Sequence, residues 1–143
     1  MVTGTVEVSS SDPSASLRIG FVPQQDILPP TLTVYEALLF AARLRLPEGL
    51  SDANKRQRVD EILAKLGISH LRNVRIGYAG HTGGSRSRGI SGGEMRRVSI
   101  GLELIADPDI LILDEPTSGK SAQIALCTFL LINRHRIGFC LCV

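Results

Sequence analysis

The sequence predicts an α/β fold, and three observations support that prediction. β-rich segments lie at both ends of residues 1–119, "GTVEV" with "LRIGFV" at one end and "ILIL" at the other. Three segments between them carry the capping residues or the apolar spacing of α-helices. The 143 residues are enough for one domain with its own core, and the 43% of apolar residues argue against general disorder.

The first elements are two strands and a loop. "GTVEV", residues 4–8, alternates apolar and polar residues, and "LRIGFV", residues 17–22, is rich in β-forming residues. A turn is expected between them at Asp12-Pro13. Residues 24–30, "QQDILPP", should be a loop, because two adjacent prolines cannot continue a helix or a central strand.

Two helices are predicted next. Thr33 and Glu36 have the spacing of a capping box, and the helix that they open should stop before Pro47. A second helix should begin at residue 51 or 52 and end at Gly67, since glycine suits the position after a helix. Its apolar stripe consists of Val59, Ile62, Leu63 and Leu66.

A loop, a third helix and a strand complete the predicted domain. Residues 74–90 should be loop, because they are rich in Gly, Ser and Arg, and Ser91 with Glu94 forms a second possible capping box. After a turn at residues 107–109, the wholly apolar residues 110–113 predict a strand buried on both faces. One face of the third helix carries Met95, Val98, Leu102 and Ile105.

Charge and hydropathy restrict the class of protein. The net charge of +2 argues neither for nor against a nucleic-acid partner, and we expect none. No run of about 18 apolar residues is present, and residues 1–16 do not have the form of a secretory signal, so we expect neither a membrane span nor a leader here. A local group of basic residues is either a solvated loop or an anion site, and it comprises Arg75, Arg86, Arg88, Arg96 and Arg97.

The cysteines lie together near the C-terminus. Cys127, Cys140 and Cys142 are an odd set without a signal peptide, which favours reduced thiols. A metal site formed by Cys140, Cys142 and His135 is the weaker alternative, because a C-x-C pair alone is a poor signal.

The residues that follow the last predicted strand look at first like a phosphate-binding loop. Residues 119–121, Gly-Lys-Ser, match the end of the G-x-x-x-x-G-K-[ST] pattern. Asp114 stands at the place of the first glycine, Glu115 follows it, and Pro116 has no N–H to offer a phosphate. Two carboxylates repel a phosphate, and Pro116 lacks the N–H group that would bind it. We therefore reject this interpretation.

The two carboxylates have another use. Asp114 and Glu115 come directly after a buried strand, and open α/β sheets place their ligand sites at such ends. The aspartate could hold Mg²⁺, and the glutamate could accept a proton from an attacking water. The alternative is an ordinary acidic turn on the surface.

Residues 91–94 form the second candidate site. The N-terminus of a helix carries unsatisfied N–H groups and a partial positive charge, and Gly92 and Gly93 have no side chain that would keep a phosphate away. The alternative is an ordinary capped helix with a flexible lead-in.

Together these features resemble the ATP-binding cassette of ABC transporters. Residues 90–119, "ISGGEMRRVSIGLELIADPDILILDEPTSG", are similar to the signature helix and the Walker B strand, and residues 20–47 to the Q-loop and the start of the helical subdomain. The segments "TLTVYEAL", "RGISGGEMRRVSIG" and "DEPTSG" resemble those of subfamily G, the White/pleiotropic-drug-resistance type of half-transporter. The resemblance covers about residues 3–119 and implies a partial P-loop NTPase-type domain with a helical subdomain at about residues 33–106.

The resemblance also implies a site for Mg·ATP between two cassettes. Gln24 would bind the nucleotide's Mg²⁺, Asp114 would hold that metal ion, and Glu115 would be the catalytic base. Contacts to the γ-phosphate of ATP on the partner cassette are implied for Ser91, Gly92 and Gly93. Arg96 and Arg97 match basic positions for which we expect only packing or surface roles.

The sequence departs from the family's pattern at two places. No G-x-x-x-x-G-K precedes Gln24, and Lys120 follows Ser118-Gly119 where the family has a leucine and the D-loop aspartate. We therefore expect residues 1–119 to be a partial cassette without Walker A. Residues 120–143 should be a divergent, poorly packed tail that arises from a frame change, a missed splice site or a degraded gene, with a possible helix at residues 122–132. Alone, the chain is predicted to be inactive.

The resemblance predicts the function as ATP hydrolysis coupled to export of an apolar or lipid-like solute. The implied partners are a second cassette and a transmembrane domain, at the cytoplasmic face of a membrane. Two alternatives remain open. One is an inert or regulatory fragment that docks on a full cassette, and the other is a soluble, non-transport ABC ATPase.

Overall fold

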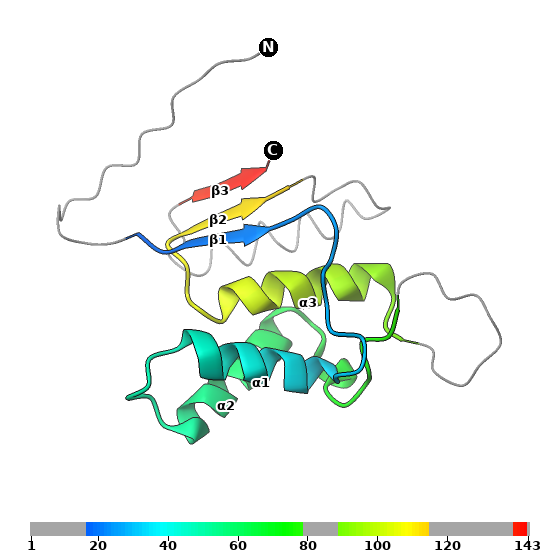
Figure 1. Ribbon diagram of the computed structural model, residues 1–143, viewed down its shortest axis with the longest axis horizontal. Coiled ribbons are helices and arrows are strands. Elements are labelled where there is room, and N and C mark those ends of the chain that lie inside the picture. The colour runs from blue at the N-terminus through cyan, green and yellow to red at the C-terminus, as the bar shows by residue number, and fades with distance from the viewer. Residues whose placement is uncertain (1–16, 79–88, 115–138, 143) are drawn as a thin grey trace, which may run out of the picture.

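The computed structural model describes residues 17–78, 89–114 and 139–142, and these contain strands, helices and one short 3-10 helix (Figure 1). The strands are β1 (Ile19–Val22), β2 (Ile110–Leu113) and β3 (Phe139–Cys142). The helices are α1 (Val34–Arg45), α2 (Asp52–Lys65) and α3 (Gly92–Leu104), and the 3-10 helix η1 is Ser69–Leu71. The predicted α/β class is confirmed.

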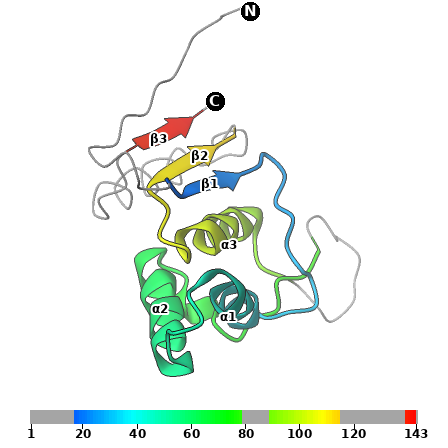
Figure 2. The ribbon, with the colours of Figure 1, turned by 60° about the vertical axis from the view of Figure 1, so that its left-hand side comes forward.

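The strands form one parallel sheet in the order β1-β2-β3. Ile19 pairs with Ile110 at one end of the first pair, and Val22 pairs with Leu113 at the other. Figures 1 and 2 show α1, α2 and α3 on one side of this sheet, with α3 next to the strands and α1 and α2 beyond it. A parallel sheet joined through helices is the arrangement expected for an α/β chain.

The helices begin where their capping residues predict. Both capping boxes are formed: Thr33 Oγ1 accepts from the Glu36 N–H at 3.2 Å, and Ser91 Oγ accepts from the Glu94 N–H at 3.4 Å. Ser51 Oγ likewise caps the start of α2. Gly67 has a φ of 66°, which is the left-handed conformation that ends a helix.

Helix α3 is the centre of the packing. A Cβ added at Gly101 would lie 2.9 Å from Leu66 Cδ1, 3.2 Å from Leu38 Cδ2 and 3.3 Å from Ile62 Cγ2. Glycine at this place therefore allows α1 and α2 to approach the α3 backbone closely. The fully buried side chains of the core include Leu38, Ile62, Ile100, Ile105 and Leu111.

The strand burial differs from the prediction of a strand buried on both faces. Leu111 and Leu113 of β2 are buried, whereas Ile110 and Ile112 are only half-buried. On β1, Phe21 is 51% exposed. The reason is that α3 covers one face of the sheet, while no described helix covers the other.

Four residues of the tail, which is predicted to be poorly packed with no designed place in the core, pair with the sheet. Residues Phe139–Cys142 form β3, which pairs in parallel register with β2. Backbone hydrogen bonds suffice to add a short apolar segment to a sheet edge, whatever the origin of its sequence. The predicted strand at residues 4–8 and the possible helix at residues 122–132 lie outside the described residues.

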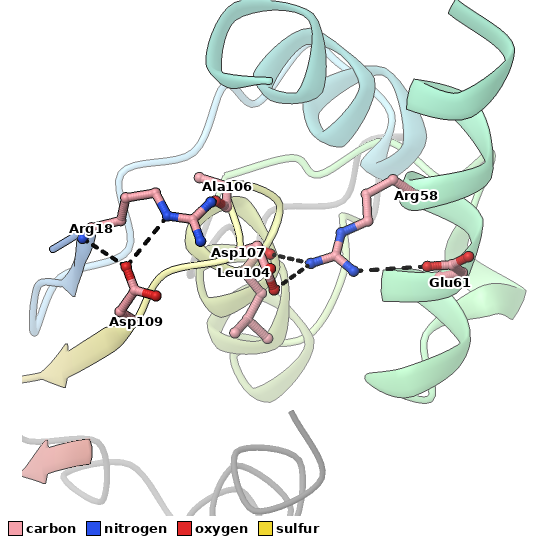
Figure 3. A network of polar contacts seen from close by, with 7 residues as sticks. All are labelled: Arg18, Arg58, Glu61, Leu104, Ala106, Asp107 and Asp109. Atoms are coloured by element: carbon pink, nitrogen blue, oxygen red, sulfur yellow. Dashed lines mark hydrogen bonds and ion pairs between the residues drawn. The ribbon is translucent and has the colours of Figure 1, made fainter. Parts of the chain in front are cut away.

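Three arginines bind the C-terminal end of α3. Arg45 donates to the Leu102 carbonyl at 2.8 Å, Arg58 to that of Leu104 at 3.2 Å, and Arg18 to that of Ala106 at 3.3 Å. Figure 3 shows how Arg18, just before β1, and Arg58 of α2 approach this end, and how they also contact Asp109 and Asp107. Since α3 has no basic residue in its last turn, these side chains supply the cations that a helix C-terminus favours.

Candidate nucleotide-binding site

The ends of β1 and β2 bring two of the predicted site residues to one edge of the sheet. Val22 pairs with Leu113, and the Asp114 N–H donates to the Val22 carbonyl at 3.0 Å. Gln24 follows β1 on this edge and is exposed, while Asp114 follows β2 and is half-buried. The strand register therefore places these two residues just beyond the ends of paired strands.

The N-terminus of α3 lies at the same edge. Figures 1 and 2 show that α3 begins at the end of the molecule toward which the strand arrows point. Gly92 is exposed, and nothing lies within 4 Å of the place where its Cβ would be. The first N–H groups of a helix have no partner within the helix, so an anion can approach this backbone closely.

The lead-in to α3 is held by a contact between two backbones. Gly77 has a φ of 72°, and a Cβ added to it would lie 2.5 Å from the Gly89 Cα. Ile90 N–H donates to the Ile76 carbonyl at 3.0 Å at the same crossing. Glycine at both positions allows the two backbones to touch, and this contact fixes the position of Ser91 at the start of α3.

Ser91 is already engaged in its capping box. Its hydroxyl lies 2.8 Å from Glu94 Oε2, and its backbone N–H donates to the same oxygen at 2.7 Å. This backbone hydrogen bond is the main reason why the pKa of Glu94 lies below its ordinary value. His70 Nε2 lies 3.7 Å from the other carboxylate oxygen. In this conformation, an anion would meet the backbone of Gly92 and Gly93 before the serine hydroxyl.

Arg96 has a role that sequence reasoning missed. Its side chain is 8% exposed, so of the two expected roles, packing or surface, it is packing that the burial supports. Nη2 donates to the Asp114 carbonyl at 2.8 Å, and Nη1 contacts the carbonyls of Pro23 and Gln24 and Asp26 Oδ1. The sequence holds little sign of this role, because these acceptors lie 18 to 73 residues away along the chain.

Among the described residues, Arg97 and the other members of the basic group named above do not form an anion site. Arg75 is exposed and Arg97 is half-buried, with its Nε buried and lacking a described hydrogen-bond partner. Arg86 and Arg88 lie outside the described residues. Because Arg96 donates to carbonyls and to Asp26, its charge is used within the fold.

The residues of the edge fit a divalent cation that is held together with a nucleotide. Gln24 and Asp114 would supply oxygen ligands, and Mg²⁺ is usually bound by one or two protein carboxylates plus phosphates and waters. Within the described ranges no group of three or more His, Cys, Asp and Glu side chains is placed to hold a metal by itself. Glu115 and His135 lie outside the described residues, so neither the predicted base nor the cysteine–histidine metal site is tested.

A cleft of about 850 Å³ lies at the opposite edge of the sheet. Among the residues that line it are Arg18, Arg45 and Arg58, which are the arginines that bind the end of α3. Each of them pairs with a carboxylate, namely Asp109, Glu103 or Asp107. The charges of these three arginines, as far as the described residues show, are therefore balanced within the fold.

None of the helices in the described ranges is long and apolar enough to cross a bilayer.

Comparisons with known proteins match most of the chain. The family described as "ABC transporter" matches residues 2–118. ABC transporter G family member 22 of Arabidopsis thaliana is 47% identical over 116 residues, which are 81% of this chain and 15% of that protein. A broad substrate specificity ATP-binding cassette transporter of Rattus norvegicus is 39% identical over 135 residues, which are 93% of this chain and 20% of that protein. The chain thus spans only 15% to 20% of the length of these relatives.

Proposed function

The chain belongs to the ABC transporter family, in its subfamily G, and from this premise we propose that residues 1–119 are part of a cassette that hydrolyses ATP. Hydrolysis would drive export of an apolar or lipid-like solute across a membrane. The observation that carries the proposal is the meeting of Gln24, Asp114 and the N-terminus of α3 at one edge of a parallel sheet. Open α/β sheets bind nucleotides at this edge.

Each site residue has a proposed task that follows from its chemistry. Gln24 and Asp114 would bind Mg²⁺, which neutralises charge on the phosphates when it is bound. Glu115 would accept the proton of the attacking water. The backbone at Gly92 and Gly93, after the Ser91 cap, would donate N–H groups to a γ-phosphate.

The site carries oxygen acceptors in one place and N–H donors in another, and this separation supports a second cassette as partner. Gln24 and Asp114 offer oxygens that suit a cation, whereas the N-terminus of α3 offers N–H groups that suit an anion. We propose that the α3 end serves ATP on a second copy or a related cassette. A transmembrane domain of the kind found in half-transporters would place both cassettes at the cytoplasmic face of a membrane. The G family names of the relatives favour this assembly over a soluble, non-transport ABC ATPase.

The first experiment tests the site in these 143 residues alone. They contain no G-x-x-x-x-G-K-[ST], and that loop supplies the main cradle for the phosphates. We expect calorimetric titration with Mg·ATP to give dissociation constants weaker than about 1 mM, at which the binding free energy is only about 4 kcal/mol. No phosphate release should be measured. Micromolar binding or turnover would contradict this account of the missing loop.

The second experiment tests the function in the natural protein that carries this segment. Glu115→Gln should lower phosphate release at least about 100-fold, the lower range for loss of a general base, while ATP binding persists. Glu48→Gln, the same change in the loop between α1 and α2, is the matched control and should leave hydrolysis unchanged. Equal rates for Glu115→Gln and the unaltered protein would rule out this residue as the base.

A further inference from the structure

Arg96 joins the two turns that carry the proposed metal ligands. We propose that it is a positioning residue, which fixes the spacing between Gln24 and Asp114 and so sets the geometry in which they hold a divalent cation. The inference rests on the proposed function for its consequence, although its structural part does not. It assigns to Arg96 a task in the site that is distinct from contact with the nucleotide.

The contacts of the guanidinium divide between the two turns. Nη1 faces the turn after β1, where it contacts the carbonyls of Pro23 and Gln24. Nη2 faces the turn after β2 and donates to the Asp114 carbonyl at 2.8 Å. A guanidinium is planar and rigid, so its two nitrogens hold the two turns at a fixed separation.

The backbone hydrogen bonds between β1 and β2 cannot fix the separation of the two turns, because the turns lie beyond the ends of the strands. The pairing of β1 with β2 ends at Val22 and Leu113, and Asp114 N–H donates to the Val22 carbonyl at 3.0 Å. Beyond this hydrogen bond, the Asp114 carbonyl accepts from Arg96 Nη2 at 2.8 Å. Arg96 therefore takes over the connection between the turns at the point where the backbone pairing ends.

The charge of Arg96 is balanced inside the fold. Asp26 Oδ1 lies 3.3 Å from Nη1, and the two side chains are 20% and 8% exposed. A buried cation with this partner is not offered to a phosphate, which separates its task from that of an ATP ligand. Removal of the guanidinium would leave the carbonyls of both turns without their donor.

The first test measures amide exchange by NMR in the 143-residue chain. Arg96→Met keeps much of the volume of the side chain but removes the guanidinium, whose two terminal nitrogens contact the two turns. We expect the Asp114 amide, at the braced edge, to exchange about 10- to 100-fold faster, as loss of hydrogen bonds to a charged group predicts. The Ile110 amide, which donates to the Arg18 carbonyl at the opposite edge, should change by less than about threefold.

Two further variants sharpen this measurement. Arg96→Lys should give an intermediate rate, because one ammonium can satisfy one turn but lacks the rigid fork that spans both. Arg43→Met, the same loss of an arginine at a half-exposed side chain on α1, should leave the Asp114 amide unchanged. Equal acceleration at both edges of the sheet, or none at either, would overturn the assignment.

The second test uses the natural protein that carries this segment. In Arg96→Met, the Mg²⁺ concentration for half-maximal ATP hydrolysis should rise about tenfold or more, as for residues that orient metal ligands, with partial restoration in Arg96→Lys. A fall in rate that is the same at every Mg²⁺ concentration would overturn the inference. If the unaltered protein hydrolyses no ATP, the proposed function fails, and the exchange rates still decide whether Arg96 joins the turns.

Discussion

At the scale of single residues, the charges at the start of α2 respond to pH. Asp52 accepts from Arg43 Nε at 2.9 Å and from Arg56 Nε at 2.7 Å. The hydrogen bond from Arg43, followed by that from Arg56, lowers the pKa of Asp52 from 3.8 to about 2. Folding therefore favours the ionised carboxylate, and its contribution is complete above pH 3.8 and lost as the pH falls toward 2.

Asp52→Asn should accordingly destabilise the chain at neutral pH, and the difference from the unaltered chain should close between about pH 4 and pH 2. Urea unfolding at a series of pH values measures this difference. Because both partners are half-exposed, 1 M salt should reduce it at neutral pH. A difference that stays constant down to pH 2 would contradict the assigned pKa.

Residue-scale predictions from the sequence succeeded where the partners are close along the chain. Thr33 with Glu36 and Ser91 with Glu94 lie three positions apart, so their spacing alone predicts the caps that are observed. Arg96 was missed because its acceptors come from other elements. Spacing also could not indicate that the Ser91 hydroxyl is held by Glu94, since a free and an engaged cap have the same sequence.

At the scale of elements, α3 depends on a small residue where it meets the other helices. Gly101→Val should lower the free energy of unfolding by about 1–3 kcal/mol, as for overpacked cores, because the new side chain would press on Leu66, Leu38 and Ile62. This loss outweighs the small gain in helix propensity on replacing glycine. Chemical denaturation measures it.

Gly49→Val is the matched control for this change. Nothing lies within 4 Å of the place of a Gly49 Cβ, so its effect should stay within about 0.5 kcal/mol, as for surface substitutions. Similar effects at the two positions would show that the contact of α3 with α1 and α2 is looser than described.

Element types were predictable from the sequence, and their surroundings were less so. The three helices and the strand at Ile110–Leu113 follow from caps, stripes and an apolar run. That run did not reveal that Ile110 and Ile112 would be only half-buried, because burial depends on what covers the far face of the sheet. The pairing of Phe139–Cys142 with β2 was also missed, since a four-residue apolar segment carries no sign of its partner.

At the scale of the whole molecule, the layers leave apolar side chains exposed on β1 and just before it. Leu17, Ile19 and Phe21 are 40%, 58% and 51% exposed, on the face that the described helices do not cover. Contiguous apolar surface of this kind promotes association. Phe21→Ser should therefore shift the 143-residue chain toward smaller species, as measured by sedimentation velocity.

The same substitution on a helix provides the comparison. Phe40 on α1 is 61% exposed, against 51% for Phe21, so Phe40→Ser removes at least as much exposed aromatic surface at another place. It should change the distribution of species much less than Phe21→Ser. Equal shifts would show that general surface hydropathy, rather than the face of the sheet, governs association.

The pairing of β1 with β2 has a consequence for the time course of synthesis. Ile19 pairs with Ile110, which the ribosome adds 91 residues later. At about 5–20 residues per second, this delay is on the order of 5–20 s. α1 and α2 rely on local contacts and can form during this interval, whereas β1 must wait for its partner strand. The nascent chain thus leaves Val22, which is 1% exposed in the folded chain, without its partner strand β2 for seconds.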